Sequence, residues 1–337
     1  DYVINWGDGS STTLTAAELA ATAGAVDHVY DDGATDVTIS VDVAGEDGTH
    51  VAVGTLDVTV NNIVPTVALS GAATVDEGST YTLNVGAVTD PGDDTVTDYV
   101  INWGDGSSTT LTAAELAATA GAVDHVYADD AAHVPITVDV LDDDGTHTAA
   151  GTLTIDVNNV APTVALSGAA TVDEGSIYTL NVGAITDPGD DTVTDYVINW
   201  GDGSSTTLTA AELAATAGAV DHVYTDDAAN VTISVDVLDD DGTHTAAGTL
   251  TIDVNNVVPT VALSGAATVA EGSTYTLNVG AITDPGDDTV TDYVINWGDG
   301  SSTTLTAAEL AATAGAVDHV YDDGATDVTI SVDVAGE

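Results

Sequence analysis

The chain has 337 residues, of which 56 are Asp or Glu and none is Lys or Arg, and this gives a formal net charge of −56. Without basic residues it cannot neutralise phosphate, which excludes nucleic acids and anionic membrane surfaces as partners. It also has no Cys, and so neither disulfides nor thiolate metal sites. No apolar run approaches the roughly 20 residues of a membrane-spanning helix, so we expect no membrane insertion in this segment.

A ten-residue segment, Asp-Tyr-Val-Ile-Asn-Trp-Gly-Asp-Gly-Ser, occurs four times, each copy 97 residues after the one before. This period predicts tandem modules, each the size of a small domain. We predict a partial module over 1–62, complete modules over 63–159 and 160–256, and a module lacking its last strand over 257–337. Because residues 292–337 repeat residues 1–46 letter for letter, we expect the chain to be part of a longer repetitive polypeptide.

Within the second repeat, the hydrophobic pattern is that of short strands separated by turns. Apolar and polar residues alternate over 66–70, 80–88, 98–103, 123–127, 134–141 and 148–157. Several alternating strands of this length predict a β-sandwich. Tyr99, Ile101 and Trp103 fall on one face of their strand, so we expect them in the core.

One helix interrupts the strands. Thr112 and Glu115 fit a capping box, and Gly121 suits the position after the last turn. Leu116 is the residue expected to hold the helix against the sandwich. Two interpretations remain open: the helix covers a sheet edge, or its Ala-rich surface makes a lateral contact between arrays.

Three segments of each repeat carry a resemblance to a known family. In the second repeat they are Trp103-Gly104-Asp105-Gly106, His125-Val126-Tyr127, and a Val/Thr-rich strand ending at Asp142 to Gly145. In this order they resemble the PKD-type domain, an immunoglobulin-like β-sandwich. The resemblance implies an all-β fold, a linear array of immunoglobulin-like modules, an extracellular spacer or adhesive role, and no enzymatic activity.

The linkers between repeats are short. Val60-Asn61-Asn62 and its copies end each module, and Pro65, Pro162 and Pro259 hold the following residues extended. Neighbouring modules must therefore nearly touch, which predicts a semi-rigid array.

Acidic loops are the candidate sites. In an immunoglobulin-like order, alternate loops fall at opposite ends of a module, so the far end of one module meets the near end of the next. Carboxylates and carbonyls gathered there without a basic partner suit Ca²⁺, which takes 6–8 oxygen ligands. The candidate ligands are Asp76, Glu77, Asp90, Asp93, Asp94, Asp142, Asp144, Asn158, Asn159, Asp173, Glu174, Asp187, Asp190, Asp191, Asp239, Asp241, Asn255, Asn256, Asp284, Asp287 and Asp288.

The competing interpretation is that these loops are only acidic turns of a very soluble protein, since no EF-hand spacing is present and turns favour Asp for backbone reasons. One copy departs from the pattern: Ala270 stands where earlier repeats have Asp76 and Asp173. If that Asp is a ligand, the junction after the fourth repeat should bind Ca²⁺ more weakly.

The histidines show no metal-ligand spacing. His125 and its copies in the His-x-Tyr element are expected to be structural, whereas His50, His147 and His244 are expected to be exposed. We expect no catalysis, because any Ser, His and Asp arrangement would be duplicated in every module.

The sequence therefore predicts an extracellular or cell-surface structural region, stiffened by Ca²⁺ at its junctions, that serves as an adhesin stalk or surface filament. Its partners would be neighbouring modules of the same chain. The alternative is a self-assembling filament, sheath or S-layer-like subunit whose modules contact other copies of the chain. An accessory array of a secreted hydrolase, binding carbohydrate or protein, ranks last because it would need an exposed aromatic platform.

Overall fold

The computed structural model describes residues 1–33, 36–92, 94–324 and 327–336. The chain forms two compact units, residues 1–160 with 188–190 and residues 161–187 with 191–337. Unit 1 contains the first and second repeats, and unit 2 contains most of the third and all of the fourth. No helix within the described ranges is long and apolar enough to cross a membrane.

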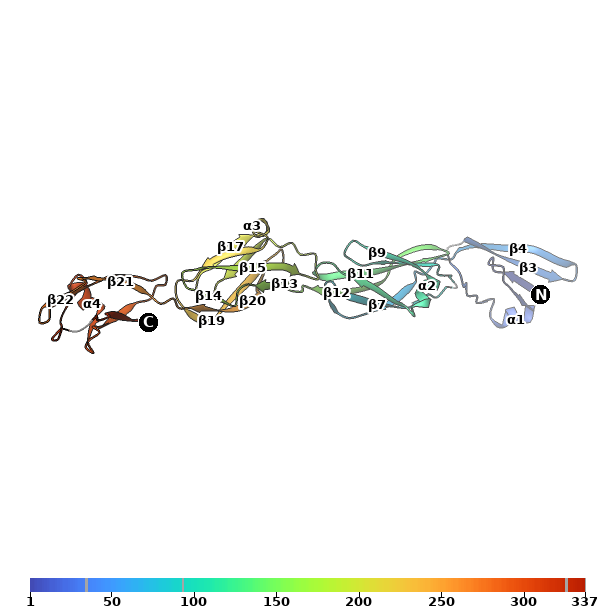
Figure 1. Cartoon of the computed structure of the whole chain (residues 1–337). Helices are drawn as coiled ribbons and strands as arrows, with labels where there is room; N and C mark the ends of the chain where they lie inside the picture. The colour runs from blue at the N-terminus through green and yellow to red at the C-terminus, as the bar shows by residue number, and fades with distance from the viewer. Residues whose placement is uncertain (34–35, 93, 325–326, 337) are drawn as a thin grey trace. The chain divides into compact units, whose positions relative to one another are not determined.

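The second repeat, in unit 1, is a complete β-sandwich (Figure 1). One sheet has the order β10-β7-β5 and the other the order β6-β12-β11-β8-β9. The elements are β5 (Thr66–Ser70), β6 (Thr74–Asp76), β7 (Thr80–Thr89), β8 (Asp98–Asn102), β9 (Ser108–Thr112), α2 (Ala113–Ala118), β10 (Ala122–Val126), β11 (Ala131–Asp142) and β12 (Gly145–Asn158).

The core of this sandwich lies between its two sheets, where the alternation of each strand places its apolar residues. Leu83 of β7 meets Ile101 and Trp103 from the end of β8, and Ile136 of β11 completes the centre; all four are fully buried. The predicted inward face of the Asp-Tyr-Val-Ile-Asn-Trp strand is therefore confirmed.

The third repeat has the same architecture, with its strands in unit 2. Its sheets have the orders β13-β15-β18 and β14-β20-β19-β16-β17. The elements are β13 (Thr163–Ser167), β14 (Thr171–Asp173), β15 (Ile177–Thr186), β16 (Asp195–Asn199), β17 (Ser205–Thr209), α3 (Ala210–Ala215), β18 (Ala219–Val223), β19 (Ala228–Leu238) and β20 (Thr243–Asn255).

The fourth repeat, also in unit 2, pairs two three-stranded sheets, β21-β22-β25 and β24-β23-β26. Its core is built from copies of the same residues, including Ile295 and Trp297. The elements are β21 (Thr260–Gly265), β22 (Thr274–Thr283), β23 (Val290–Asn296), β24 (Ser302–Thr306), α4 (Ala307–Ala312), β25 (Ala316–Val320) and β26 (Ser331–Gly336).

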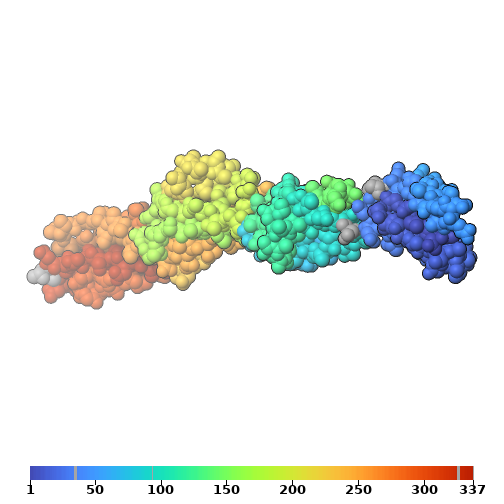
Figure 2. Space-filling model, turned by 90° about the vertical axis from the view of Figure 1, so that its right-hand side faces the viewer, coloured from blue at the N-terminus to red at the C-terminus, as the bar shows by residue number. Residues whose placement is uncertain are grey.

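The first repeat, in unit 1, forms a single sheet of order β2-β1-β3-β4, and its residues are dark to light blue in Figure 2. Residues 25–29, whose copies are strands, form no strand here, because the described residues of this repeat hold no neighbour equivalent to β7. Val53 and Leu56 are exposed for the same reason, since their copies Ala150 and Leu153 pack against the core of the second repeat. The elements are β1 (Tyr2–Asn5), β2 (Ser11–Leu14), α1 (Ala16–Ala21), β3 (Asp36–Gly45) and β4 (Gly48–Thr59).

The predicted helix is present in all four repeats, with both bonds of the capping box formed and Leu116 buried in the second repeat. Its predicted end at Gly121 is wrong: the helix stops at Ala118, and Thr119 is its C-cap. Ala120 and Gly121 then both take positive φ. A Cβ on Gly121 would lie 2.4 Å from the Val85 carbonyl oxygen, so the chain needs glycine there to pass β7.

Two strands were absent from the sequence-based prediction. β6 is only three residues long and pairs in parallel with the end of β12. β9 has the sequence Ser-Thr-Thr-Leu-Thr, which shows no alternation of apolar and polar residues because only Leu111 is apolar. It nevertheless pairs with all five residues of β8. The all-β class, tandem immunoglobulin-like sandwiches each with one short helix, is confirmed.

Candidate metal centre at the repeat junctions

A buried glutamate marks the end of the third repeat. β14 runs parallel to the last residues of β20, and the following turn places Gly175 at positive φ. Glu174 in this turn is fully buried, and its Oε1 accepts a hydrogen bond of 2.6 Å from the linker amide of Val257. Its Oε2 is buried with no hydrogen-bond partner among the described residues, although buried polar atoms normally have one.

Three aspartates surround this glutamate. Asp226 and Asp227 lie between β18 and β19, and Asp288 lies between β22 and β23 of the fourth repeat. One carboxylate oxygen from each of these and one from Glu174 all lie within 4.8 Å of one another. Such a set, with no Lys or Arg anywhere in the chain, is chemically suited to a hard divalent cation with oxygen ligands.

The loop of the fourth repeat is held against Glu174 by its backbone. Asp287 donates its amide to the Thr225 carbonyl at 2.7 Å. A Cβ on Gly286 would lie 2.6 Å from Cδ of Glu174, so only glycine lets the loop approach this closely. Asp284 accepts from the Gly286 amide at 3.1 Å and so shapes the loop.

Electrostatics in this cluster favour the uncharged form of Asp288. Burial raises its pKa, and the charges of Asp284, Asp227 and Asp226 raise it further. A hydrogen bond of 3.0 Å from the side-chain amide of Asn256 opposes these effects. The carboxylates therefore repel one another, which a bound cation would relieve.

The near end of the second repeat, in unit 1, carries two overlapping carboxylate groups. Asp90, Asp94 and Asp142 form one, and Asp94 with Asp144 and Asp32 of the first repeat forms the other. Burial, followed by the charges of Asp90 and Asp144, raises the pKa of Asp94 to about 6. Its Oδ1 is buried without a hydrogen bond to any described residue.

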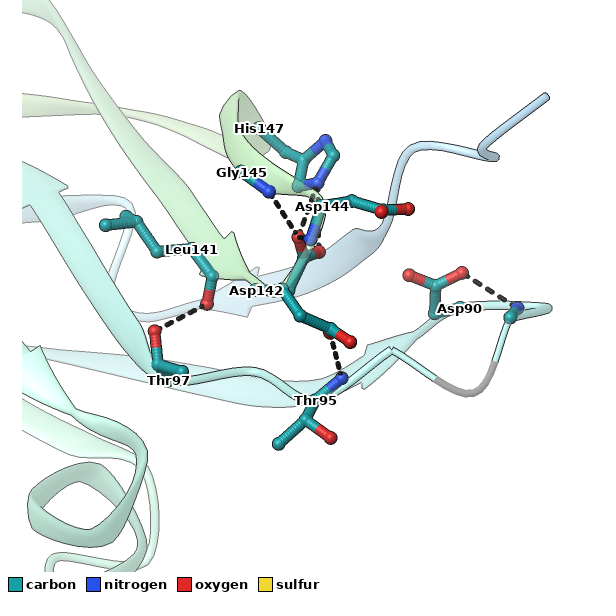
Figure 3. Close-up of polar contacts among 10 residues, drawn as sticks. Asp90, Thr95, Thr97, Leu141, Asp142, Asp144, Gly145 and His147 are labelled. Atoms are coloured by element: carbon teal, nitrogen blue, oxygen red, sulfur yellow. Dashed lines mark hydrogen bonds and ion pairs between the residues drawn. The ribbon is translucent and has the colours of Figure 1, made fainter. Parts of the chain in front are cut away.

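Asp142 is different, because its side chain is already engaged. Figure 3 shows Asp144, Gly145 and His147 gathered around its carboxylate. The amides of Asp144 and Gly145 donate to it at 3.0 and 3.1 Å, and Nε2 of His147 lies 2.9 Å away. Asp239 repeats this arrangement in the third repeat, with Asp241 donating its amide and His244 beside it. Oδ1 of each aspartate therefore shapes its hairpin, and Asp142 also belongs to the carboxylate group with Asp90 and Asp94.

The other predicted ligands fall into three groups. Asp76 and Asp173 accept from the side chains of Asn158 and Asn255, the last residues of β12 and β20, and lie outside the carboxylate groups above. Asp93 lies outside the described residues. The rest stand in the same turns and linkers as the residues above: Glu77, whose Oε1 accepts from Val160 at 2.6 Å, together with Asn159, Asp187, Asp190 and Asp191.

Asp32, Asp226 and Asp227 were missed by the sequence-based prediction. Each follows the tyrosine of the His-x-Tyr element by two or three residues. That strand ends where the Asp-Glu-Gly turn lies, since Gly175 donates its amide to the Tyr224 carbonyl at 2.8 Å. The position of these residues after a predicted strand was the available signal.

The prediction that His147 and His244 are exposed is wrong. Their side chains are only 11% and 15% exposed, because each closes onto the aspartate of its own hairpin. His125 has the predicted structural role: its ring stacks on Trp103 at 4.5 Å between centroids, and Nε2 lies 2.7 Å from Asp105. The copy of Asp105 in the fourth repeat, Asp299, has its pKa lowered to about 2 by hydrogen bonds from Ser301 and His319.

Comparisons with known proteins assign no family. No family model matches the chain, and no curated protein matches it. A crystal structure of the chicken CNTN1 FN1-FN3 domains matches with 13% identity over 80% of this chain and 93% of that chain, at a TM-score of 0.23. A TM-score this low supports no functional inference, and the sandwich architecture is evident from the strand order itself.

Proposed function

We propose that this chain is a structural repeat region of an extracellular or cell-surface protein. Its PKD-like modules would extend as a semi-rigid array, as an adhesin stalk or surface filament, with Ca²⁺ at the junctions. The observation that carries this proposal is the attachment of the linkers after the second and third repeats to the module before them. Glu77 accepts from the linker amide of Val160, and Glu174 accepts from the linker amide of Val257.

The composition of the junction supports Ca²⁺ as the stiffening ion. The chain has no cationic side chain except its eight His residues, and every ion pair of the described residues joins a His to an Asp of a turn or strand. None of them reaches the carboxylates around Glu174. A bound cation would offset their repulsion and fix the linker, which an extended spacer requires.

Small-angle scattering and calorimetry of the purified chain test this function. With Ca²⁺ we expect a longer maximum dimension and a higher melting temperature than with EDTA. Equal lengths and melting temperatures under both conditions would contradict a Ca²⁺-stiffened array.

A self-assembling filament is the second candidate, favoured by one apolar pair on the surface. Ile177 of β15 and Val223 of β18 are register partners and are 68% and 41% exposed. Fibres formed by the purified chain would support lateral assembly, whereas a monomer in sedimentation with Ca²⁺ would support the passive stalk. An accessory binding array has less support, since the large apolar residues exposed in the described ranges are all aliphatic and offer no aromatic platform.

A further inference from the structure

Three aspartates of the second repeat form a carboxylate group within a single module, here called the Asp142 group. Asp90 and Asp94 lie between β7 and β8, and Asp142 is the last residue of β11. One oxygen of each lies within 4.8 Å of the other two, and Figure 3 shows the loops of Asp90 and Asp142 beside each other. The group takes no residue from a neighbouring repeat, which distinguishes it from the Glu174 group.

Each of these carboxylates has a buried oxygen that accepts no hydrogen bond from a described residue: Oδ2 of Asp90, Oδ1 of Asp94 and Oδ2 of Asp142. The Asp142 side chain has no exposed surface, and buried polar atoms normally have a partner. Nε2 of His147 lies 2.9 Å from both oxygens of Asp142, but its single N–H cannot satisfy three carboxylates. Buried carboxylates that lack donors and lie this close together suit a hard divalent cation.

Backbone donors hold the other oxygens of two members of the group. Gly92 donates its amide to Oδ1 of Asp90 at 3.0 Å. Asp144 donates its amide to Oδ1 of Asp142 at 3.0 Å. Asp94 folds back over Gly92, where a Cβ would lie only 3.0 Å from its Oδ2. Carboxylates that bind metals are commonly held by hydrogen bonds of this kind, so the group is oriented without a cation.

Hairpin geometry alone does not account for Asp142. Its Oδ1 accepts from the amides of Asp144 and Gly145 and so orients the side chain in the turn. In the first repeat glycine stands at this position: Gly45 pairs with Gly48, and the same hairpin closes without the aspartate. The carboxylate therefore adds a charge that the turn does not require.

Asp94 also belongs to the carboxylates that meet a neighbouring repeat. In unit 1, one of its oxygens lies within 4.8 Å of one from Asp32 of the first repeat. In unit 2 its copy, Asp288, stands in the same relation to Asp226, the copy of Asp32, within the Glu174 group. A carboxylate has two oxygens and can bind two cations at once, as in two-metal sites. This position is thus placed to serve a cation on each side.

We infer that the second repeat binds a divalent cation of its own through Asp90, Asp94 and Asp142, and that Asp94 bridges this cation to the one at the junction. This inference rests on the proposed Ca²⁺ role and adds the number of ions and the ligand that couples them. Loss of either ion weakens the site of the other, because both use one carboxylate. At the corresponding positions the third repeat carries the same three aspartates: Asp187, Asp191 and Asp239.

Equilibrium dialysis of the whole chain against Ca²⁺, after removal of metal with a chelator, counts the bound ions and tests the inference. Salt at about 0.15 M screens diffuse binding to the acidic surface. Asp142→Asn keeps an acceptor for the hairpin amides but loses the charge, so it should bind one ion fewer than the wild type. Asp90→Asn should lose the same single ion. Asp94→Asn should lose two, because its carboxylate serves both sites.

Asp143→Asn is the matched control, because it removes one charge from the same hairpin. Its Oδ1 accepts from the Thr95 amide, which Asn also supports, and its carboxylate lies outside the Asp142 group. It should bind as many ions as the wild type, and circular dichroism in EDTA checks that each variant folds.

Two results would overturn the inference while leaving the junction cation standing. One is an unchanged ion count in Asp142→Asn and Asp90→Asn, which would exclude the cation within the module. The other is a loss of only one ion in Asp94→Asn, which would exclude the bridge. Absence of any Ca²⁺ binding by the wild type at about 1 mM, within the range of extracellular modules, would overturn the proposed function as well.

Discussion

Replacing Glu174 with Gln should change stability in opposite directions with and without Ca²⁺. The amide keeps the shape of the side chain, and its Oε1 can still accept from the Val257 amide, now at 2.6 Å. What is lost is one negative charge at a fully buried position beside Asp226, Asp227 and Asp288. In EDTA that charge destabilises the fold, whereas in Ca²⁺ the carboxylate that carries it is a ligand of the ion.

The size of each effect follows from burial and from mass action. A buried polar atom without a partner costs about 1–3 kcal/mol, and more when charged. The neutral NH₂ of Gln would stand among the neighbouring carboxylates and can donate to one of them, so Glu174→Gln should stabilise the metal-free junction by at least about 1 kcal/mol. A cation at 100 times its dissociation constant stabilises the native state by about 2.7 kcal/mol, and the variant should lose most of this. For a domain of this size, the loss lowers the melting temperature by about 10–20 °C.

Differential scanning calorimetry of the variant in EDTA and in Ca²⁺ measures both effects. Glu212→Gln is the matched control, because it removes one charge from the same repeat. Glu212 lies in the capping box with Thr209, which Gln also supports, so it should melt like the wild type in both conditions. If Ca²⁺ raises the melting temperature of Glu174→Gln as much as that of the wild type, Glu174 is not a ligand and the reasoning fails.

Three further predictions concern the modules and their titration. Tyr224→Phe should destabilise the third repeat by about 1–2 kcal/mol in denaturant melts, since the hydroxyl donates to the Trp200 carbonyl at 3.0 Å. Tyr178→Phe should be neutral or stabilising, because that hydroxyl is equally buried and has no hydrogen bond within the described residues; equal losses would point to ring packing instead. Gly218→Ala should cost about 1–3 kcal/mol from its positive φ alone, and more because its Cβ would lie 2.3 Å from the Val182 carbonyl oxygen; a melt unchanged from wild type would contradict this. In EDTA, the pKa of Asp94 is raised from 3.8 to about 6 in the folded state, so protonation of Asp94 stabilises the fold. This stabilisation is greatest below pH 3.8 and is lost as pH rises through about 6. Wild-type melting temperatures that rise over this interval, relative to those of Asp94→Asn, would refute the prediction.

Sequence reasoning recovered those features that a short-range pattern determines. The alternation around Tyr99, Ile101 and Trp103 predicted the core strand, and the Thr112 to Glu115 spacing predicted the capping box, because each depends on neighbours within a few residues. β9 was missed since its Ser/Thr residues carry no hydrophobic period, and its pairing with β8 alone makes it a strand.

The candidate site was predicted less completely, for a physical reason. Turn geometry indicated that Glu174 and Asp288 would meet from opposite sides of a junction, and the structure brings them together. Whether an Asp uses its oxygens locally is a matter of tertiary contacts. Asp142 lies in a carboxylate group with Asp90 and Asp94, and its Oδ1 also accepts from two backbone amides, which the sequence alone does not indicate. Asp227 was absent from the predicted ligands, yet one of its carboxylate oxygens lies within 4.8 Å of one of Glu174.

The distribution of satisfied carboxylates explains how a chain without Lys or Arg can fold and where it still needs a cation. On the sheet faces, acids accept from neutral donors: Asp124 accepts from the Thr82 hydroxyl at 2.6 Å, and Asp139 accepts from the amide of Ala149 at 2.8 Å. Such bonds favour the charged form without any basic partner. At the junction the acids instead converge on Glu174, whose Oε2 no described group satisfies. Dependence on a cation should therefore be local: its removal should loosen the junctions while the sandwiches remain folded.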